Sequence, residues 1–146
     1  MRTLAIDLGS RRVGFALSDQ GGRFATPYEV VEVTSPAQAS EAALRIITRE
    51  GVERIVLGLP LNMDDTVGPA AKQTATWGRE LSEKSGKPLV LVDERLSSFD
   101  AEQQLNARKR GGEKLTRKRK KEQLDAIAAA GFLQSFLDGK LPAIDV

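Results

Sequence analysis

Two continuous apolar runs constrain the fold of this chain more than any other feature. They are "RIVLGLP" at residues 54–60 and "PLVLVDE" at residues 88–94. A strand with one face in water alternates apolar and polar residues, whereas a parallel strand that is covered on both faces is apolar throughout. The two runs therefore predict parallel strands with helices packed on both sides of their sheet.

Three further segments with strand character come earlier in the chain. They are residues 3–9, 13–19 and 26–33, and they are separated by the short connections "SRR" and "QGGRFA". Connections of this length favour an antiparallel meander. The chain is therefore expected to begin with three antiparallel strands.

Four helices are predicted around and after the parallel strands. The first has Ser35 as its N-cap, followed by Pro36 and the capping-box partner Gln38, and it ends at Gly51. The others are predicted over residues 69–85, 98–110 and about 116–137. The order βββαβαβαα predicts an α/β fold with a mixed five-stranded sheet flanked by helices. The length of 146 residues predicts a single domain that spans 1–146.

The chain contains no cysteine and no histidine. The first absence excludes disulfides, thiolate nucleophiles and Cys-ligated zinc, and it fits a reducing cytoplasm. The second excludes Ser-His-Asp hydrolases and every nuclease with a histidine base. No apolar run approaches the roughly 18 residues that a membrane span needs, and the N-terminus lacks a signal-peptide cleavage site. We therefore expect a soluble, cytoplasmic protein whose chemistry uses carboxylates, Lys/Arg, hydroxyls or a cofactor.

Positive charge is concentrated in one segment. Residues 106–122 hold nine Lys or Arg and two acids, a net charge of +7, so the rest of a chain whose total is +2 carries −5. A packed domain gains nothing from concentrated like charge, and this asymmetry indicates a polyanionic partner. The alternative is a solvated helix face. The predicted nucleic-acid-binding residues are the five consecutive basic positions Arg117, Lys118, Arg119, Lys120 and Lys121.

Acidic residues interrupt apolar segments at three places. Asp7 lies in "LAIDLG", Asp93 and Glu94 follow "LVLV", and Asp125 lies in an apolar, alanine-rich helix. If the first strand is central and the last helix packs on its sheet, these acids meet. Adjacent residues point to opposite faces of a strand, so only one of Asp93 and Glu94 is expected in the site.

Three carboxylates in one pocket repel one another, and burial adds a cost of desolvation. Mg²⁺ or Mn²⁺ relieves both effects, because these ions prefer oxygen ligands and also bind substrate phosphate. Two such ions, roughly 3.5–4 Å apart, clamp the attacking and leaving oxygens of a phosphoryl displacement and supply a hydroxide. The acids therefore predict a site for two Mg²⁺ or Mn²⁺ ions, to which the basic segment attracts a phosphodiester.

Four motifs carry a resemblance to a known family. They are "AIDLGSRRVGFALSD", "LGLPLNMD", "VDERLSS" and "KKEQLDAIAAAGFLQ", and they closely resemble those of the YqgF/RuvX family. Its members are Holliday-junction-resolvase-like proteins, also implicated in maturing the 5′ end of 16S ribosomal RNA. The resemblance implies an RNase H-like fold and a nuclease that acts on structured RNA or branched DNA. It places the family's catalytic and metal-binding acids on Asp7, Glu94 and Asp125, with Asp93 or Arg95 in a supporting salt bridge.

The chain departs from the family pattern at one position. The family usually has glycine after the Asp of the "GLP...D" loop, and Asp65 stands there in this chain. A backbone with positive φ at this position would be less favourable with Asp than with glycine, although Asp tolerates it better than most residues.

Two other functions stay open. The first alternative is that the chain is a catalytically weak nucleic-acid-binding module of ribosome or recombination complexes. It also resembles actin-like and sugar-kinase ATPases in "DLGSRRVG", but their second phosphate loop and second domain are not visible. Trp77 is expected in the core, and Ser97 and Ser98 are expected as helix caps. Because the chain has one Trp and one Tyr, stacking platforms for bases are not expected, and recognition of nucleic acid is expected mainly through phosphate contacts and shape. The oligomeric state is left open, with a homodimer as one option.

Overall fold

The computed structural model describes residues 1–97 and 117–146, and within them every side chain except those of residues 96–97 and 117–123. The predicted helix over 98–110 lies outside these ranges. The elements are β1 (Thr3–Leu8), β2 (Arg12–Ser18), β3 (Ala25–Glu32), α1 (Pro36–Glu50), β4 (Arg54–Leu59), α2 (Pro69–Ser85), β5 (Leu89–Asp93), the short 3-10 helix η1 (Glu94–Ser97) and α4 (Arg117–Leu137).

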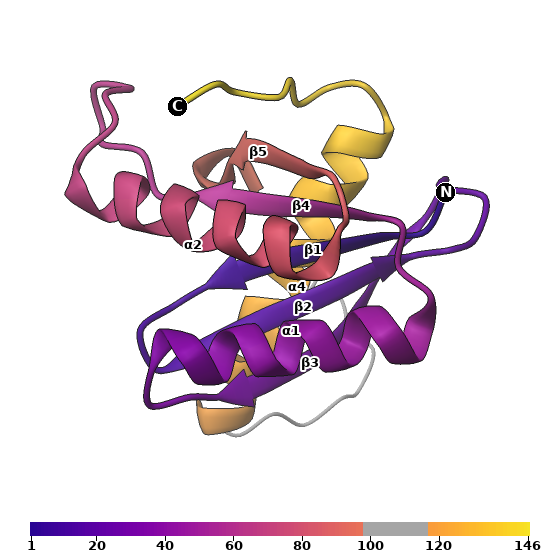
Figure 1. Cartoon of the computed structure of the whole chain (residues 1–146). Coiled ribbons are helices and arrows are strands. Elements are labelled where there is room, and N and C mark those ends of the chain that lie inside the picture. The colour runs from indigo at the N-terminus through magenta and orange to yellow at the C-terminus, as the bar shows by residue number, and fades with distance from the viewer. Residues whose placement is uncertain (98–116) are drawn as a thin grey trace.

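The sheet has five strands in the order β3-β2-β1-β4-β5. The pairs β1–β2 and β2–β3 are antiparallel, while β1–β4 and β4–β5 are parallel. The predicted meander and the two predicted parallel strands are therefore confirmed, and β1 occupies the centre of the sheet (Figure 1). A residue near the end of β1 thus has protein on both sides.

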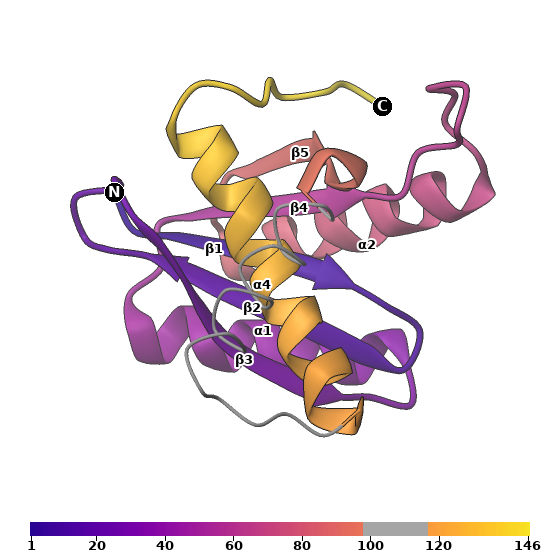
Figure 2. The ribbon, with the colours of Figure 1, turned by 180° about the vertical axis from the view of Figure 1, so that it is seen from behind.

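Helices cover both faces of the sheet. Figure 1 shows α1 and α2 on one face, and Figure 2 shows α4 crossing the other. Successive residues of β1 serve the two faces in turn: Leu4 and Ile6 pack under α1 and α2, whereas Ala5 packs under α4. Because Asp7 follows the same alternation as Ala5, the face covered by α4 is the face of the acid.

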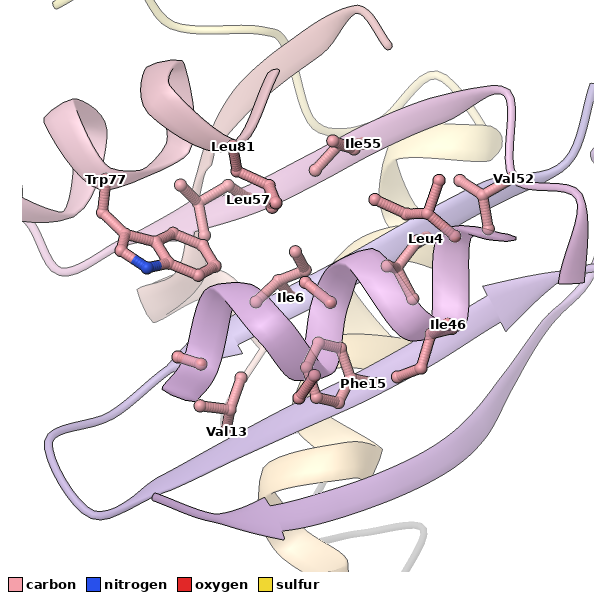
Figure 3. Close-up of a cluster of buried hydrophobic side chains, with 14 of the residues drawn as sticks. Leu4, Ile6, Val13, Phe15, Ile46, Val52, Ile55, Leu57, Trp77 and Leu81 are labelled. Carbon is pink, nitrogen blue, oxygen red and sulfur yellow. The ribbon is translucent and has the colours of Figure 1, made fainter. Parts of the chain in front are cut away.

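The larger core lies under α1 and α2. It contains Phe15 and Leu57 of the sheet together with Ile46, Trp77 and Leu81 of the helices (Figure 3). The smaller core, under α4, includes Ala16, Val56, Val92, Ala129, Phe132 and Leu133. The small residues Ala5, Ala16 and Ala129 leave little side-chain bulk between α4 and the centre of the sheet.

The two helices on the first face begin differently. In α1 the Ser35 hydroxyl accepts a hydrogen bond from the Gln38 backbone N–H at 3.3 Å, and the Gln38 side chain accepts one from the Thr34 N–H at 2.7 Å. The predicted Ser35 cap is confirmed, but the return bond differs from a capping box, because Gln38 accepts from the residue before the N-cap and not from Ser35 itself. In contrast, α2 begins after Gly68 and has no side-chain cap. Both helices end at a left-handed glycine, Gly51 and Gly86 respectively.

Among the helices in the described ranges, none has the length and apolar character needed to cross a membrane.

Candidate active site

The site is built around Asp7, on the central strand. In the register of β1 and β2, Asp7 lies opposite Gly14. A Cβ atom on Gly14 would overlap the backbone carbonyl of Asp125 and lie 2.9 Å from the Ala126 nitrogen. The backbone of α4 therefore rests directly on β2 at Gly14, and this close approach brings Asp125 beside Asp7.

Glu94 reaches the same face from the end of β5. It is the first residue of η1, and its side chain lies over Gly58 of the neighbouring strand. A Cβ atom on Gly58 would lie 2.8 Å from the Glu94 Cβ, 2.9 Å from the Phe132 ring and 3.1 Å from the Glu94 Oε2. The missing side chain at Gly58 thus provides the space in which Glu94 extends across β4 toward β1.

The carboxyl groups of Asp7 and Glu94 share a hydrogen bond. Burial and the negative charge of Asp7 raise the pKa of Glu94 to about 9. Burial also raises the pKa of Asp7, although the hydrogen bond from Glu94 opposes this shift. At neutral pH, Glu94 consequently keeps a proton and donates it to the Asp7 carboxylate. Two acids so close retain one proton because two buried negative charges would repel each other.

Asp125 forms a salt bridge with an arginine. Its Oδ2 accepts a hydrogen bond from the Arg12 Nε at 2.8 Å, and the two side chains are 27% and 37% exposed, respectively. Its charge nevertheless contributes to raising the pKa of Asp7 and of Glu94. Within residues 1–97 and 117–146, no three acidic side chains already form a group that could hold one metal ion. The structure therefore brings Asp7 and Glu94 together and leaves Asp125 nearby, on Arg12.

Asp93 faces Arg95 and not Asp7. The Arg95 Nε and Nη2 donate to the two carboxylate oxygens of Asp93 at 2.9 and 2.7 Å, and these bonds lower the pKa of Asp93. The predicted supporting salt bridge is confirmed, and Glu94 is the member of the pair that approaches Asp7.

Arg95 also holds the loop that follows β4. Its Nη2 donates to Asp65 Oδ1 at 2.5 Å and its Nη1 to the Asn62 carbonyl at 2.5 Å. Asp65 has a φ of 67°, the only positive value at a non-glycine residue in the described part of the chain. The departure from the family's glycine therefore falls on a left-handed backbone, where the Asp side chain has an arginine partner.

Three residues of this arrangement were missed by sequence reasoning. Gly14 and Gly58 interrupt apolar strands, and an isolated strand glycine is a recognised signal of close backbone approach. Arg12 follows Asp7 closely in the chain, but nothing in that spacing shows that its partner is Asp125. The basic positions 117–121 lie in the first turns of α4, and their side chains fall outside the described ones. Their contact with nucleic acid stays a prediction.

Known proteins resemble this chain in sequence over nearly its whole length. A family model described as "RuvX: Holliday junction resolvase" matches residues 1–139. A "Putative pre-16S rRNA nuclease" of Anaeromyxobacter sp. (strain K) is 41% identical over 142 residues, which cover 97% of this chain and 100% of the relative. A relative of the same name from Geobacillus kaustophilus is 40% identical and covers 96% of this chain and 99% of its own.

Solved structures show the same fold at low identity. RuvC of Thermus thermophilus has a TM-score of 0.61 at 16% identity, covering 99% of this chain and 100% of its own. The Fowlpox virus resolvase in complex with Holliday junction DNA has a TM-score of 0.56 at 10% identity, covering 95% and 98%. The fold is RNase H-like, as the sequence motifs implied. Because the family model spans nearly the whole chain and relatives with about 40% identity agree with it, the protein belongs to the RuvX family of resolvase-like nucleases.

Proposed function

We propose that the protein is a metal-dependent nuclease that hydrolyses phosphodiester bonds of structured nucleic acid, in 5′-end processing of the 16S rRNA precursor, in resolution of branched DNA, or in both. The observation that carries the proposal is the hydrogen-bonded pair Asp7–Glu94, with Asp125 on the same face of the sheet. The family name and the names of the relatives support the choice of substrate. The whole chain, 1–146, is proposed to act as one domain.

The acids present fit a divalent ion. Asp7, Glu94 and Asp125 offer only carboxylate oxygens, which Mg²⁺ and Mn²⁺ prefer. Two of them resist ionisation because burial and mutual charge raise their pKa, and a cation nearby would favour the ionised form. When bound, the metal would activate water and neutralise charge on the phosphate. To bind the metal with all three acids, the chain must release the Glu94 proton and bring the Asp125 carboxylate toward Asp7 and Glu94.

Arg12 has a second proposed role. A guanidinium group binds phosphate as well as carboxylate through paired N–H donors. Once Asp125 turns toward the other acids, Arg12 loses its partner at the mouth of the site. We propose that Arg12 then binds a phosphate group of the substrate backbone, beside the bond that is cleaved.

One observation favours a second candidate function. In the described ranges the three acids do not form a ready group for metal, and Arg12 neutralises Asp125. A protein that stays in this arrangement would bind nucleic acid without cleaving it efficiently.

Cleavage assays separate the two functions. Pure protein is incubated with a 16S rRNA precursor fragment, a four-way DNA junction and single strands, each with Mn²⁺, Mg²⁺ or EDTA. The nuclease proposal expects cleavage that EDTA abolishes and that Asp7→Asn lowers by about 100-fold or more. The matched control is Glu41→Gln, at an exposed acid of α1, which should cleave normally. Binding without cleavage in all conditions would favour the binding module.

A further inference from the structure

A cavity of about 410 Å³ lies on the face of the sheet opposite α4. It is bounded by the N-terminal ends of α1 and α2 and by the ends of β1 and β4, where Leu8, Ser10 and Pro60 line it. This volume is within the roughly 300–1,000 Å³ of small-molecule sites. In α/β sheets, such sites form beyond the carboxyl ends of the parallel strands. Neither the acids nor the basic segment lies in this cavity.

Thr74 is the polar residue that points to a ligand. Its side chain lines the cavity and is only 8% exposed, yet its hydroxyl has no hydrogen-bond partner in the part of the chain that the structure describes. The Thr74 oxygen is not one of the fully buried atoms without a partner, so it keeps some contact with the cavity, where water or a ligand can hydrogen-bond to it. Gln73 and Ser10 add exposed polar groups to the same wall, and the first turn of α2 beside Ala70 has no side-chain cap.

The other walls are apolar. They include Pro36 and Trp77, and the Trp77 indole projects from α2 toward α1, where its N–H donates to the Pro36 carbonyl at 3.0 Å (Figure 3). No charged side chain of the described residues lines the cavity. A phosphate or carboxylate would therefore be desolvated without a cation to balance it. The fitting ligand is a flat, uncharged group with hydrogen-bond donors and acceptors on its edge, and a nucleobase has all of these properties.

Two residues that line the cavity are close along the chain to residues of the acidic site. The backbone N–H of Gly9, which lines the cavity, donates to the carbonyl of Arg12 at 2.9 Å, and Arg12 binds Asp125 on the other side of this loop. Pro60, which also lines the cavity, comes two residues after Gly58, and the Glu94 side chain lies over Gly58. The cavity and the acids thus lie at the same edge of the sheet, on opposite faces, and a strand that passes around this edge would contact both.

We propose that this cavity binds one unstacked nucleobase of the substrate strand, adjacent to the phosphodiester that is cleaved. The inference rests on the proposed nuclease function. Unpaired nucleotides enter such a pocket most readily, because no base pair has to open first. The protein would thus favour single-stranded ends and junction points over uninterrupted duplex.

The first experiment tests the cavity without cleavage. Trp77 is the single tryptophan of the chain, so its indole N–H gives one NMR signal next to the cavity. Adenosine, guanosine, cytidine and uridine are titrated into the full-length protein, and inorganic phosphate is titrated separately. At least one nucleoside should shift the Trp77 signal with saturation, and Thr74→Val should weaken that binding about 5- to 10-fold. Thr76→Val, at an exposed threonine of the same helix, should leave it unchanged. A shift by phosphate alone, or by no nucleoside at millimolar concentration, would overturn the proposal.

The second experiment links the cavity to the substrate. Single abasic nucleotides are placed in turn at each position of the substrate strand, and binding is measured in the Asp7→Asn background. One position should lower affinity about 10-fold, and Ala70→Leu, which fills the cavity from an exposed helix position, should remove that dependence. Ala37→Leu, at an exposed alanine in the first turn of α1, should keep it. Equal affinity at all positions would contradict the proposal. Since neither measurement needs catalysis, failure of the nuclease function would be seen separately.

Discussion

The proton shared by Asp7 and Glu94 ties the stability of the protein to pH. Glu94 has an ordinary pKa of 4.5 and one of about 9 in the folded chain. Between these values the folded state keeps a proton that the unfolded state has lost, so the contribution of Glu94 to stability is fully present below about pH 4.5 and falls as the pH rises toward 9. Without metal, the acidic pair therefore favours folding least under the alkaline conditions in which a metal ion would bind it best.

We predict that the free energy of unfolding in EDTA falls between pH 5 and pH 9, with a slope of up to about 1.4 kcal/mol per pH unit for this proton. Glu94→Gln should flatten the slope and be at least as stable as the parent at pH 9. Added Mn²⁺ should raise the stability of the parent at pH 9. Urea denaturation over this range measures all three effects, with Glu41→Gln as control. An identical slope in Glu94→Gln would show that Glu94 is not the titrating group.

Arg12 gives a second prediction for a single residue. The Arg12–Asp125 bond joins side chains that are partly exposed, and such pairs contribute only about 0.2–1 kcal/mol. Arg12→Ala should therefore change stability by less than about 1 kcal/mol, while weakening substrate binding through the lost phosphate contact. Arg12→Lys should restore little, because lysine lacks the paired donors. Arg11→Ala, at the residue before Arg12, is the control. If Arg12→Ala binds substrate as tightly as the parent, Arg12 does not contact the phosphate and serves only to pair with Asp125.

At the scale of secondary structure, α4 assembles the site through its contact with a glycine of β2. The contact depends on the absence of a side chain at Gly14, where α4 and the strand meet backbone to backbone. Packing of the last helix on the sheet was the condition under which the acids would meet, and the structure fulfils this condition. The contact of Asp125 with Arg12 was not predictable, because it depends on how α4 is positioned across β2 and not on local spacing.

Gly14→Ala should destabilise the fold by roughly 1–3 kcal/mol or more, since the added methyl group meets rigid backbone. It should also abolish cleavage, because α4 must move away and take Asp125 with it. The control is Gly21→Ala, whose Cβ would meet no backbone and only the Asp19 Oδ2, at 3.3 Å. Urea denaturation and the cleavage assay test both expectations. A stable and active Gly14→Ala protein would refute the importance of this close contact.

At the scale of the whole molecule, strand order and charge follow from the sequence to different degrees. The apolar runs predicted the parallel strands, and the short connections predicted the meander, since both signals are local. The crossing of Glu94 over β4 was not visible in sequence, because it needs Gly58 on a neighbouring strand. The uneven charge, +7 in residues 106–122 against −5 elsewhere, belongs to side chains that lie almost entirely outside the described ones, so its role in binding stays a prediction.

Substitution of Lys118, Arg119 and Lys120 by alanine should weaken substrate binding and reduce its dependence on salt. If each residue neutralises one phosphate, the slope of log affinity against log salt should fall by about 2 to 3. Stability should be unaffected. The control replaces Lys72, Arg79 and Lys84, which lie on α2. Equal salt slopes for the parent and the triple variant would indicate that the segment is only a solvated helix face.

The position of α4 also bears on the moment at which the protein becomes active. The first acid lies on the strand that a ribosome makes first, whereas the third lies on the final helix. A growing chain that ends before Asp125 has the sheet and the other two acids but no complete set, and Ala5, Ala16 and Val56 lack their covering helix. If all three acids are needed for cleavage, as proposed, the chain would gain activity only after α4 has been made and has packed on the sheet.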